Sequence, residues 1–265
     1  MNVLSAIIDQ KRVRVERAKV LVSPEAVRLI AKQMRGTANP HALVHALTVV
    51  DESRNNIIAE FKRRSPSKGE IRRDADPARI AKAYESAGAA AVSVITEEDY
   101  FDGSLDDLRA IRQATSLPVL RKDFIFEEYQ VYESAAAGAD ALLLIVAALN
   151  DETLRRLRRV TEEELGMDAL VEVHTRKEME RASHSGAHLI GVNNRDLGTF
   201  AVSLETSAHL FDFAPENAIL VSESGLAPEE VWKLRTIGFK GFLVGETLMR
   251  AHNPQQALRE FTQRR

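Results

Sequence analysis

The sequence predicts an α/β protein of the (β/α)8 TIM barrel class, preceded by a helical extension over residues 1–50. Two observations carry this prediction. From residue 57 onward, eight short apolar runs alternate with helical patterns, and helix-ending glycines recur at a spacing of two strand–helix units. A barrel of this kind commonly occupies about 250 residues as one domain. We therefore expect a single domain over residues 1–265, with the barrel over residues 57–265.

The extension is expected to hold three helices. Apolar side chains recur at helical spacing over residues 4–15, with acidic and basic residues between them. A second helix is predicted over Ser23–Gln33, where Ser23 is the N-cap and Pro24 stands in the first turn. A third, short helix is predicted near Pro40–Thr48. The acidic residues and the narrow apolar face of the first helix favour packing on the protein over binding to a membrane.

The eight apolar runs have the length and composition of buried strands. They are Ile57–Phe61, Ala90–Ile95, Pro118–Arg121, Ala141–Val146, Ala169–Val173, Leu189–Val192, Ala218–Val221 and Gly241–Val244. The helices between them end in a repeated way, because glycine supplies the left-handed residue that terminates a helix. These glycines are Gly88, Gly138, Gly186 and Gly238. A doubly wound sheet is the alternative, but its Gly-rich fingerprint is absent after the first strand, where KRRSPSKG stands instead.

Composition excludes several classes of protein. The net charge is −3, which gives no indication of a nucleic-acid surface. The absence of cysteine excludes disulfides, thiolate nucleophiles and cysteine-based metal sites. No apolar run has the length of a membrane span, and the N-terminus lacks the apolar core of a signal peptide. We expect a cytoplasmic protein that acts as a monomer, with a weak homodimer or contacts with other enzymes left open.

Ionisable and small residues gather where the predicted strands end. In a barrel these ends meet at one mouth, where active sites are built. The residues are Glu60 and Lys62 after the first strand, Lys122 and Asp123 after the third, Glu172 and His174 after the fifth, Asn193 and Arg195 after the sixth, Glu223, Ser224 and Gly225 after the seventh, and Gly245 and Glu246 after the eighth. Each one alone is typical of a solvated loop, but their convergence predicts a site.

The last two strand ends indicate a phosphate site. Ser224–Gly225 and Gly245–Glu246 form small turns that we expect to open helices, and free N–H groups at helix N-termini bind phosphate. Tight turns without a ligand are the alternative. We expect no metal, because His174 and Glu172 lack the further ligands that a zinc site needs.

These motifs resemble those of the indole-3-glycerol phosphate synthase family. The matching segments are AEFKRRSPSKG, TEEDYFDGS, LRKDFI, VEVHT, IGVNNRDL, VSESG and FLVGE, in that order along the chain. The resemblance implies closure of the indole ring of 1-(2-carboxyphenylamino)-1-deoxyribulose 5-phosphate in tryptophan biosynthesis, with loss of carbon dioxide and water. It implies no cofactor and no metal, and a small phosphorylated molecule as the substrate.

The resemblance also implies roles for four catalytic residues. Lys122 resembles the general acid, and a lysine among other cations is expected to have a lowered pKa. Glu172 resembles the general base. Lys62 resembles the partner of the substrate carboxylate, with a share in dehydration that the sequence leaves open. Glu60 is expected to orient these groups.

Further residues are implied to bind substrate. Asn193 and Glu223 resemble positioning residues, and Arg195 supports the turn after the sixth strand. Ser65, Ser224, Gly225, Gly245 and Glu246 resemble phosphate and loop contacts. Phe126 and Leu143 are expected as walls for the aromatic ring, with plain core packing as the alternative. The loop Arg63–Gly69 is expected to fold over bound substrate.

Two other functions stay open at this point. One is a barrel aldolase or thiazole-synthase-like enzyme in which Lys122 forms a Schiff base. The other is a barrel that binds a phosphorylated ligand without catalysis. Contacts with other tryptophan-pathway enzymes also stay open.

Overall fold

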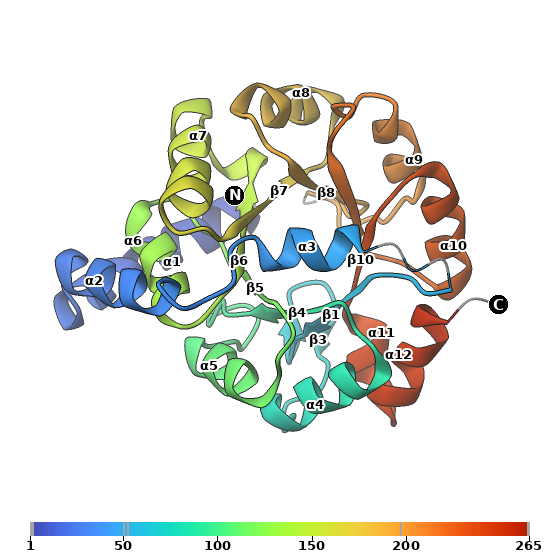
Figure 1. Ribbon diagram of the computed structural model, residues 1–265, viewed down its shortest axis with the longest axis horizontal. Helices are drawn as coiled ribbons and strands as arrows, with labels where there is room; N and C mark the ends of the chain where they lie inside the picture. Colours follow the sequence, from blue (N-terminus) through green and yellow to red (C-terminus); the bar gives the residue numbers. More distant parts are fainter. Residues whose placement is uncertain (1–2, 50, 52, 197, 264–265) are drawn as a thin grey trace.

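Eight parallel strands close into a barrel in this computed structural model, which describes residues 3–49, 51, 53–196 and 198–263. Neighbouring strands follow the order β1-β10-β9-β8-β7-β6-β5-β4, and β4 pairs with β1 to close the ring (Figure 1). The barrel strands are β1 (Ile57–Phe61), β4 (Ala91–Ile95), β5 (Val119–Lys122), β6 (Ala141–Ile145), β7 (Asp168–Val173), β8 (Leu189–Asn193), β9 (Ile219–Glu223) and β10 (Gly241–Val244). The predicted fold class is confirmed.

Some expectations fall on residues outside this description. These are the two ends of the expected domain, at residues 1–2 and 264–265, residues 50 and 52 before the barrel, and residue 197, the last of the IGVNNRDL motif.

Helices surround the barrel and alternate with its strands (Figure 1). They are α4 (Pro77–Ala87), α5 (Leu105–Ala114), α6 (Glu128–Ala136), α7 (Asp151–Arg159), α8 (Arg176–Ser185), α9 (Glu205–Phe211), α10 (Pro228–Ile237), α11 (Glu246–Arg250) and α12 (Pro254–Thr262). A 3-10 turn follows β6 (Val146–Ala148), and a π-helical turn follows α7 (Val160–Glu164). Four of these helices end one or two residues before a glycine with positive φ, as the sequence predicted: Gly88 at 84°, Gly138 at 93°, Gly186 at 81° and Gly238 at 135°.

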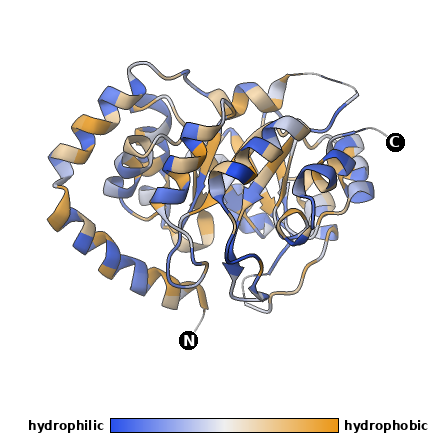
Figure 2. Cartoon of the chain, turned by 90° about the horizontal axis from the view of Figure 1, so that it is seen from below, coloured by the Kyte–Doolittle hydropathy of each residue, from blue (hydrophilic) through white to orange (hydrophobic). Residues whose placement is uncertain are grey.

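The extension forms the three predicted helices. They are α1 (Val3–Leu21), α2 (Pro24–Arg35) and α3 (Ala42–Thr48). The first two run along the outside of the barrel, where α2 packs against α6, and they stand out as an arm in the side view of Figure 2. Ser23 caps α2 by accepting a hydrogen bond from the N–H of Ala26.

Helix α3 covers the N-terminal end of the barrel, where Figure 1 shows it lying across the ring of strands. Leu43 and Leu47 pack on inward-facing side chains such as Leu120 and Leu189. The carboxylate of Asp168, at the start of β7, accepts hydrogen bonds from the first N–H groups of α3. One end of the barrel is therefore closed by apolar packing, which leaves the other end for polar chemistry.

The segment after β1 differs from the expectation of an irregular loop. It forms a two-stranded antiparallel hairpin of β2 (Arg64–Ser65) and β3 (Gly69–Glu70). Gly69 has a φ of 64°, which a glycine adopts without strain at this tight turn.

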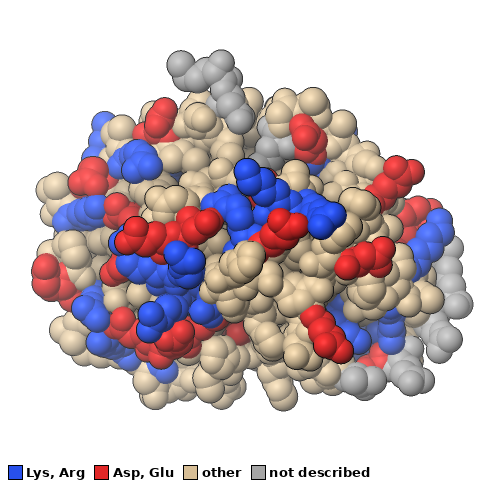
Figure 3. Space-filling model, turned by 90° about the horizontal axis from the view of Figure 1, so that it is seen from above, with Lys and Arg blue, Asp and Glu red and all other residues tan. Residues whose placement is uncertain are grey.

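The surface carries both signs of charge. Figure 3 shows acidic and basic side chains interleaved over one face of the molecule. Helical ion pairs such as Arg159 with Glu163 and Arg176 with Glu180 contribute to this mixture. Among the described helices, none is both long and apolar enough to cross a membrane.

Candidate active site

A cavity of about 890 Å³ opens at the C-terminal end of the barrel strands. Most of the residues that the sequence placed at this mouth line it. They are Glu60, Lys62, Ser65, Lys122, Leu143, Glu172, Asn193, Arg195, Glu223, Ser224, Gly225, Gly245 and Glu246. The barrel topology therefore brings together residues that are up to 186 positions apart in the sequence, from Glu60 to Glu246.

Lys122 lies at the centre of the charged groups. Its Nζ is 3.6 Å from Oε2 of Glu172 and 3.4 Å from Oε2 of Glu223. Burial lowers the pKa of Lys122. The nearby carboxylates of Glu223, Glu172 and Glu60 raise it by more, so the pKa of Lys122 lies well above the ordinary lysine value. The expectation of a lowered pKa was wrong, because carboxylates rather than cations surround this amine. Lys122 is an ammonium at neutral pH.

A second acid–base pair lies beside it. Lys62 donates a hydrogen bond of 2.6 Å to Oε1 of Glu60, and both side chains are largely buried. Burial raises the pKa of Glu60, but Lys62 and Lys122 bring it below the ordinary value. Glu60 and Lys62, at the end of the first strand, therefore pair with each other and also face the cavity.

Glu223 is the least satisfied carboxylate of the group. Both of its oxygens are buried and lack a hydrogen-bond partner among the described residues, although Lys122 lies nearby. Burial raises the pKa of Glu223 to about 7, helped by Glu172 and Glu60 and opposed by Lys122. Around neutral pH this group therefore exchanges a proton.

Two glycines make room for these carboxylates. A Cβ on Gly191, in the middle of β8, would collide with Oε1 of Glu223. A Cβ on Gly245, directly after β10, would collide with Oε1 of Glu60. Glycine at these two positions therefore leaves the space that the Glu223 and Glu60 carboxylates occupy.

Buried amides hold the mouth of β8 and β9 together. Asn193 accepts a hydrogen bond from the N–H of Arg195, whose guanidinium reaches the carbonyl of Phe200. The Asn194 side chain donates to the carbonyls of Glu223 and Ser224. The turn at Ser224, which has a φ of 70°, is therefore held from the neighbouring strand.

The two turns expected to bind phosphate lie on the same side of the cavity, but they differ in detail. Helix α11 begins directly at Glu246, as expected, whereas α10 begins only at Pro228, so Ser224–Gly225 is a turn ahead of that helix. The Glu246 carboxylate is 3.1 Å from Nε of Arg250, which also borders the cavity.

The aromatic wall differs from the expectation. Phe126 lies away from the cavity lining, with the Arg12 guanidinium 4.6 Å from its ring centroid. Phe124 and Phe101 line the cavity instead, with ring centroids 6.3 Å apart. Leu143 lines the cavity as expected.

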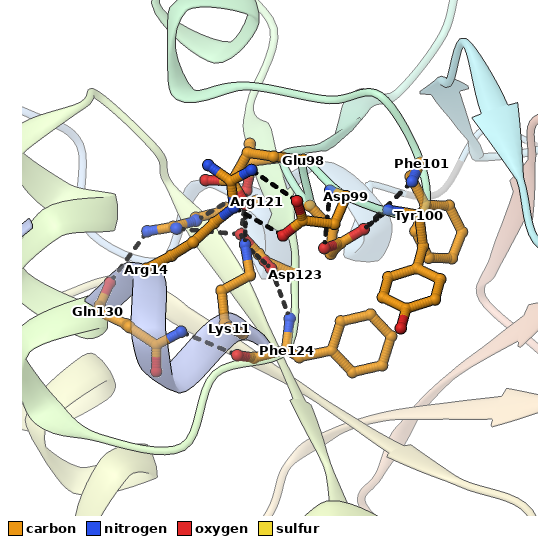
Figure 4. Close-up of polar contacts among 12 residues, drawn as sticks. Lys11, Arg14, Glu98, Asp99, Tyr100, Phe101, Arg121, Asp123, Phe124 and Gln130 are labelled. Atoms are coloured by element: carbon orange, nitrogen blue, oxygen red, sulfur yellow. Dashed lines mark hydrogen bonds and ion pairs between the residues drawn. The ribbon is translucent and has the colours of Figure 1, made fainter. Parts of the chain in front are cut away.

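A buried ionic network, drawn in Figure 4, lies behind this wall. Lys11 reaches from α1 to Asp123, at 2.9 Å, and to Glu98, at 2.5 Å. Asp123 also accepts hydrogen bonds from Arg121 and Thr96. Asp123 therefore borders the cavity, but its carboxylate faces the extension.

Nearby, the Glu97 carboxylate accepts hydrogen bonds from the N–H groups of Asp99, Tyr100 and Phe101. It thereby folds the segment that carries the Phe101 ring to the cavity (Figure 4). Oxygen atoms of Glu97, Glu98 and Asp99 lie close enough together to hold a cation, but all three carboxylates are engaged with backbone N–H groups, Lys11 or Arg14.

A family model described as indole-3-glycerol phosphate synthase matches residues 4–261. The chain belongs to the indole-3-glycerol phosphate synthase family.

Relatives that carry the same name support this assignment. Indole-3-glycerol phosphate synthase of Bacteroides thetaiotaomicron is 43% identical over 261 residues, which cover 98% of this chain and 97% of the relative. That of Carboxydothermus hydrogenoformans is 44% identical over 258 residues, which cover 96% and 97%. That of Nocardioides sp. is 50% identical over 209 residues, which cover 78% and 80%.

More distant solved structures share the barrel. Thiamine phosphate pyrophosphorylase from Pyrococcus furiosus superposes with a TM-score of 0.59 at 14% identity, over 78% of this chain and 93% of that chain. KGPDC from Streptococcus mutans gives a TM-score of 0.59 at 13% identity, over 78% and 95%. At such identities the likeness concerns the fold alone.

Sequence reasoning about this family member missed part of the cavity wall. Phe124 could have been found, because it lies two residues beyond Lys122 and alternation directs both to one side. Val3, Leu4 and Ile7 of α1 also line the cavity. Their amphipathic pattern showed a buried face but could not show what that face covers, because the contact is made between segments far apart in the chain.

Proposed function

We propose that this protein catalyses the decarboxylating and dehydrating ring closure of 1-(2-carboxyphenylamino)-1-deoxyribulose 5-phosphate to indole-3-glycerol phosphate, a carbon–carbon lyase step of tryptophan biosynthesis. Membership of the family supports this proposal. The observation that carries it is the position of the Lys122 ammonium between two carboxylates, Glu172 and Glu223, in one cavity. Ring closure needs a cationic proton donor at a carbonyl and a carboxylate that takes up a proton, and these groups supply both.

Lys122 is the general acid in this proposal. Its ammonium donates a hydrogen bond to the substrate carbonyl, and the proton moves as the oxygen gains negative charge. The carboxylates that raise the pKa of Lys122 oppose this transfer. A proton on Glu223, whose pKa is about 7, removes one of those negative charges and favours it. Glu172 is the general base in the later dehydration.

Lys62 binds the substrate carboxylate, and Glu60 holds Lys62 in place through their hydrogen bond. The aromatic ring lies against Leu143, with Phe124 and Phe101 in the place first expected for Phe126. Asn193 and Arg195 position the substrate from the end of β8.

The phosphate binds on the opposite side, at Ser224–Gly225 and Gly245–Glu246. Free N–H groups of these turns supply hydrogen bonds. The cations Arg250 and Lys68, which border the same cavity, add charge that favours a dianion. Ser65, buried directly before the turn of the hairpin, contributes from the other rim.

The hairpin after β1 closes over substrate in this proposal. Pro66, Ser67 and Lys68 at its tip line the cavity, while Arg63 at its base bonds to Asp107 in α5. A fixed base with an exposed tip suits a lid. Hydrogen exchange with and without a substrate analogue tests this, and equal protection of residues 65–69 in both states would contradict it.

The proposal also covers the setting of the enzyme. We place it in the cytoplasm as a single-domain monomer over residues 1–265, which acts on a small phosphorylated molecule rather than on nucleic acid or a membrane. This setting agrees with two observations: no described helix could span a membrane, and acidic and basic side chains are mixed on the surface.

The deciding experiment is a fluorescence assay for indole-3-glycerol phosphate. Lys122→Ala and Glu172→Gln are each expected to lower turnover by about 10²–10⁴-fold, the usual contribution of general acid–base catalysis, with a modest change in affinity. Turnover close to that of the parent would contradict the assigned chemistry, and a ligand-binding barrel would show no turnover at all.

Borohydride trapping separates the Schiff-base alternative. A Schiff base requires a neutral amine, and the carboxylates around Lys122 oppose that form. We therefore expect no covalent adduct on Lys122 after reduction with substrate present. An adduct at that position would favour an aldolase-like or thiazole-synthase-like enzyme.

A further inference from the structure

His174 lies directly after β7, on the side of Glu172 away from Lys122. Its Nε2 is 3.4 Å from Oε1 of Glu172, whereas Lys122 lies near the other carboxylate oxygen. The His174 side chain is only 11% exposed and lies outside the cavity lining. It therefore contacts the proposed base but not the space where substrate would bind.

The other ring nitrogen is anchored. Nδ1 of His174 is 3.2 Å from Oε2 of Glu178, in the first turn of α8. The same oxygen accepts the backbone N–H of His174 at 2.7 Å. Thr175 completes the anchor, because its hydroxyl accepts the N–H of Glu178. The Glu178 carboxylate bonds to the N–H of His174 rather than to that of Thr175, the cap of the helix.

This arrangement selects the charged imidazole. Each ring nitrogen faces a carboxylate oxygen, and only the imidazolium carries an N–H on both. A neutral ring would direct a lone pair at either Glu172 or Glu178. Nε2 is buried and has no hydrogen-bond partner within the described part of the chain, but it lies 3.4 Å from Oε1 of Glu172, close enough for an ion pair when the ring is charged.

We propose that His174 is the positioning residue for Glu172: held from behind by Glu178, its imidazolium keeps the Glu172 carboxylate aimed into the cavity. The inference rests on the proposed function, because it takes Glu172 as the base. The VEVHT motif would then contain two functional residues, Glu172 and His174, and His174 would act through Glu172 without touching substrate.

The surrounding charges agree with this proposal. Burial lowers the pKa of His174, but Glu178, Glu172 and Glu223 outweigh it and raise the value above the ordinary 6.5. Beyond β8, hydrogen bonds from Thr199 and Gly198 lower the pKa of Asp196, and the charge of His174 adds to this. Four carboxylates from four segments therefore act on this ring, while Lys122 and Arg181 act on its partners Glu172 and Glu178.

The test is the pH dependence of turnover in His174→Asn and Glu178→Gln. His174→Asn keeps a polar side chain but cannot carry charge. We expect the acid limb of its kcat profile to move toward higher pH by about one unit, so that turnover falls about tenfold at pH values on that limb and approaches that of the parent on the plateau above it, with KM unchanged. Glu178→Gln is expected to move the limb in the same direction by less. The matched control is His184→Asn, an exposed histidine of α8, whose profile should follow that of the parent.

A loss of equal size at every pH would indicate a merely structural role and overturn the proposal, as would an unchanged profile. NMR titration of the imidazole nitrogens in the parent gives a readout independent of activity, with the His174 signal identified by its absence in His174→Asn. We expect both nitrogens to be protonated at pH 7, and a neutral ring there would overturn the proposal. If the parent shows no turnover of the predicted substrate, the proposed function fails, and the NMR result still decides the state of His174.

Discussion

Lys122 and Asp123 are neighbours in the chain, but they belong to two buried charge clusters of opposite character. Asp123 faces Lys11 and accepts hydrogen bonds from Arg121 and Thr96. Lys122, on the other side of the strand, faces carboxylates at 3.4 Å and 3.6 Å, and one of them, that of Glu223, accepts no hydrogen bond among the described residues.

The pKa values of the two clusters differ accordingly. Burial raises the pKa of Asp123, but Lys11 and Arg121 bring it far below its ordinary value. Burial raises the pKa of Glu223 to about 7, and Lys122 only partly opposes this. A buried charge that is paired with opposite charges stabilises the fold. A buried charge that lacks such partners has a shifted pKa and exchanges protons near neutral pH, as functional groups do. The same strand end thus separates a structural cluster from a chemical one.

The largest expected effect comes from removing a partner in the structural cluster. Lys11→Met leaves Asp123 and Glu98 without their shared cation, and loss of one partner of a buried pair costs about 3–5 kcal/mol. We expect the free energy of unfolding to fall by about that amount in denaturant titrations. The turnover number of the folded enzyme should stay near that of the parent, because Lys11 does not touch the cavity.

The matched control on the same helix is Arg14→Gln. Arg14 pairs with Asp99 nearer the surface, where ion pairs contribute about 1 kcal/mol or less. Equal losses from Lys11→Met and Arg14→Gln would remove the distinction between the buried network and ordinary surface pairs.

A smaller effect, this time on catalysis, is expected from Gly191→Ala. The new methyl group collides with Oε1 of Glu223 and displaces that carboxylate from Lys122. Misplacement of a catalytic group by about 1 Å can cost about a hundredfold in rate, so we expect turnover to fall by about that factor. Gly198→Ala, in the exposed loop after β8, is the control, and a similar loss there would contradict the steric explanation.

The smallest expected effect is a pH-dependent gain in stability from Glu223→Gln. Between the ordinary value of 4.5 and the folded value of about 7, the folded protein holds a proton that the unfolded chain has released. The stability of the parent therefore falls as pH rises through this window. Relative to the parent, Glu223→Gln should gain about 2 kcal/mol between pH 4.5 and pH 6.5. Thermal unfolding at several pH values measures this, and a constant difference between the two proteins would contradict the raised pKa.

Much of the fold follows from local patterns. The eight apolar runs, the four glycines with positive φ and the Ser23 cap needed only neighbouring residues, because strand burial, helix ends and caps are local properties. The convergence of Glu60, Lys122 and Glu172 followed once a barrel was predicted, since the topology alone brings strand ends to one mouth.

Other features depended on distant contacts. The expectation of a lowered pKa for Lys122 was wrong, because its sign depends on which charges lie around the amine. Phe126 and Phe124 are two residues apart, yet only Phe124 borders the cavity, while Phe126 packs under Arg12 of the extension. The sequence also did not predict the hairpin β2–β3, because strands of two residues are too short to show alternating apolar and polar side chains.

The sequence by itself determined the barrel, its extension and the identity of the residues at the mouth, because these depend on periodicity and chain order. Only the tertiary structure decided how those residues interact. It placed Lys122 among carboxylates, left the Glu223 carboxylate without hydrogen-bond donors in the described structure, turned Asp123 toward Lys11 and set His174 between Glu172 and Glu178. Charge interactions act through space over a few ångströms, and the distances that govern them exist only once the chain has folded.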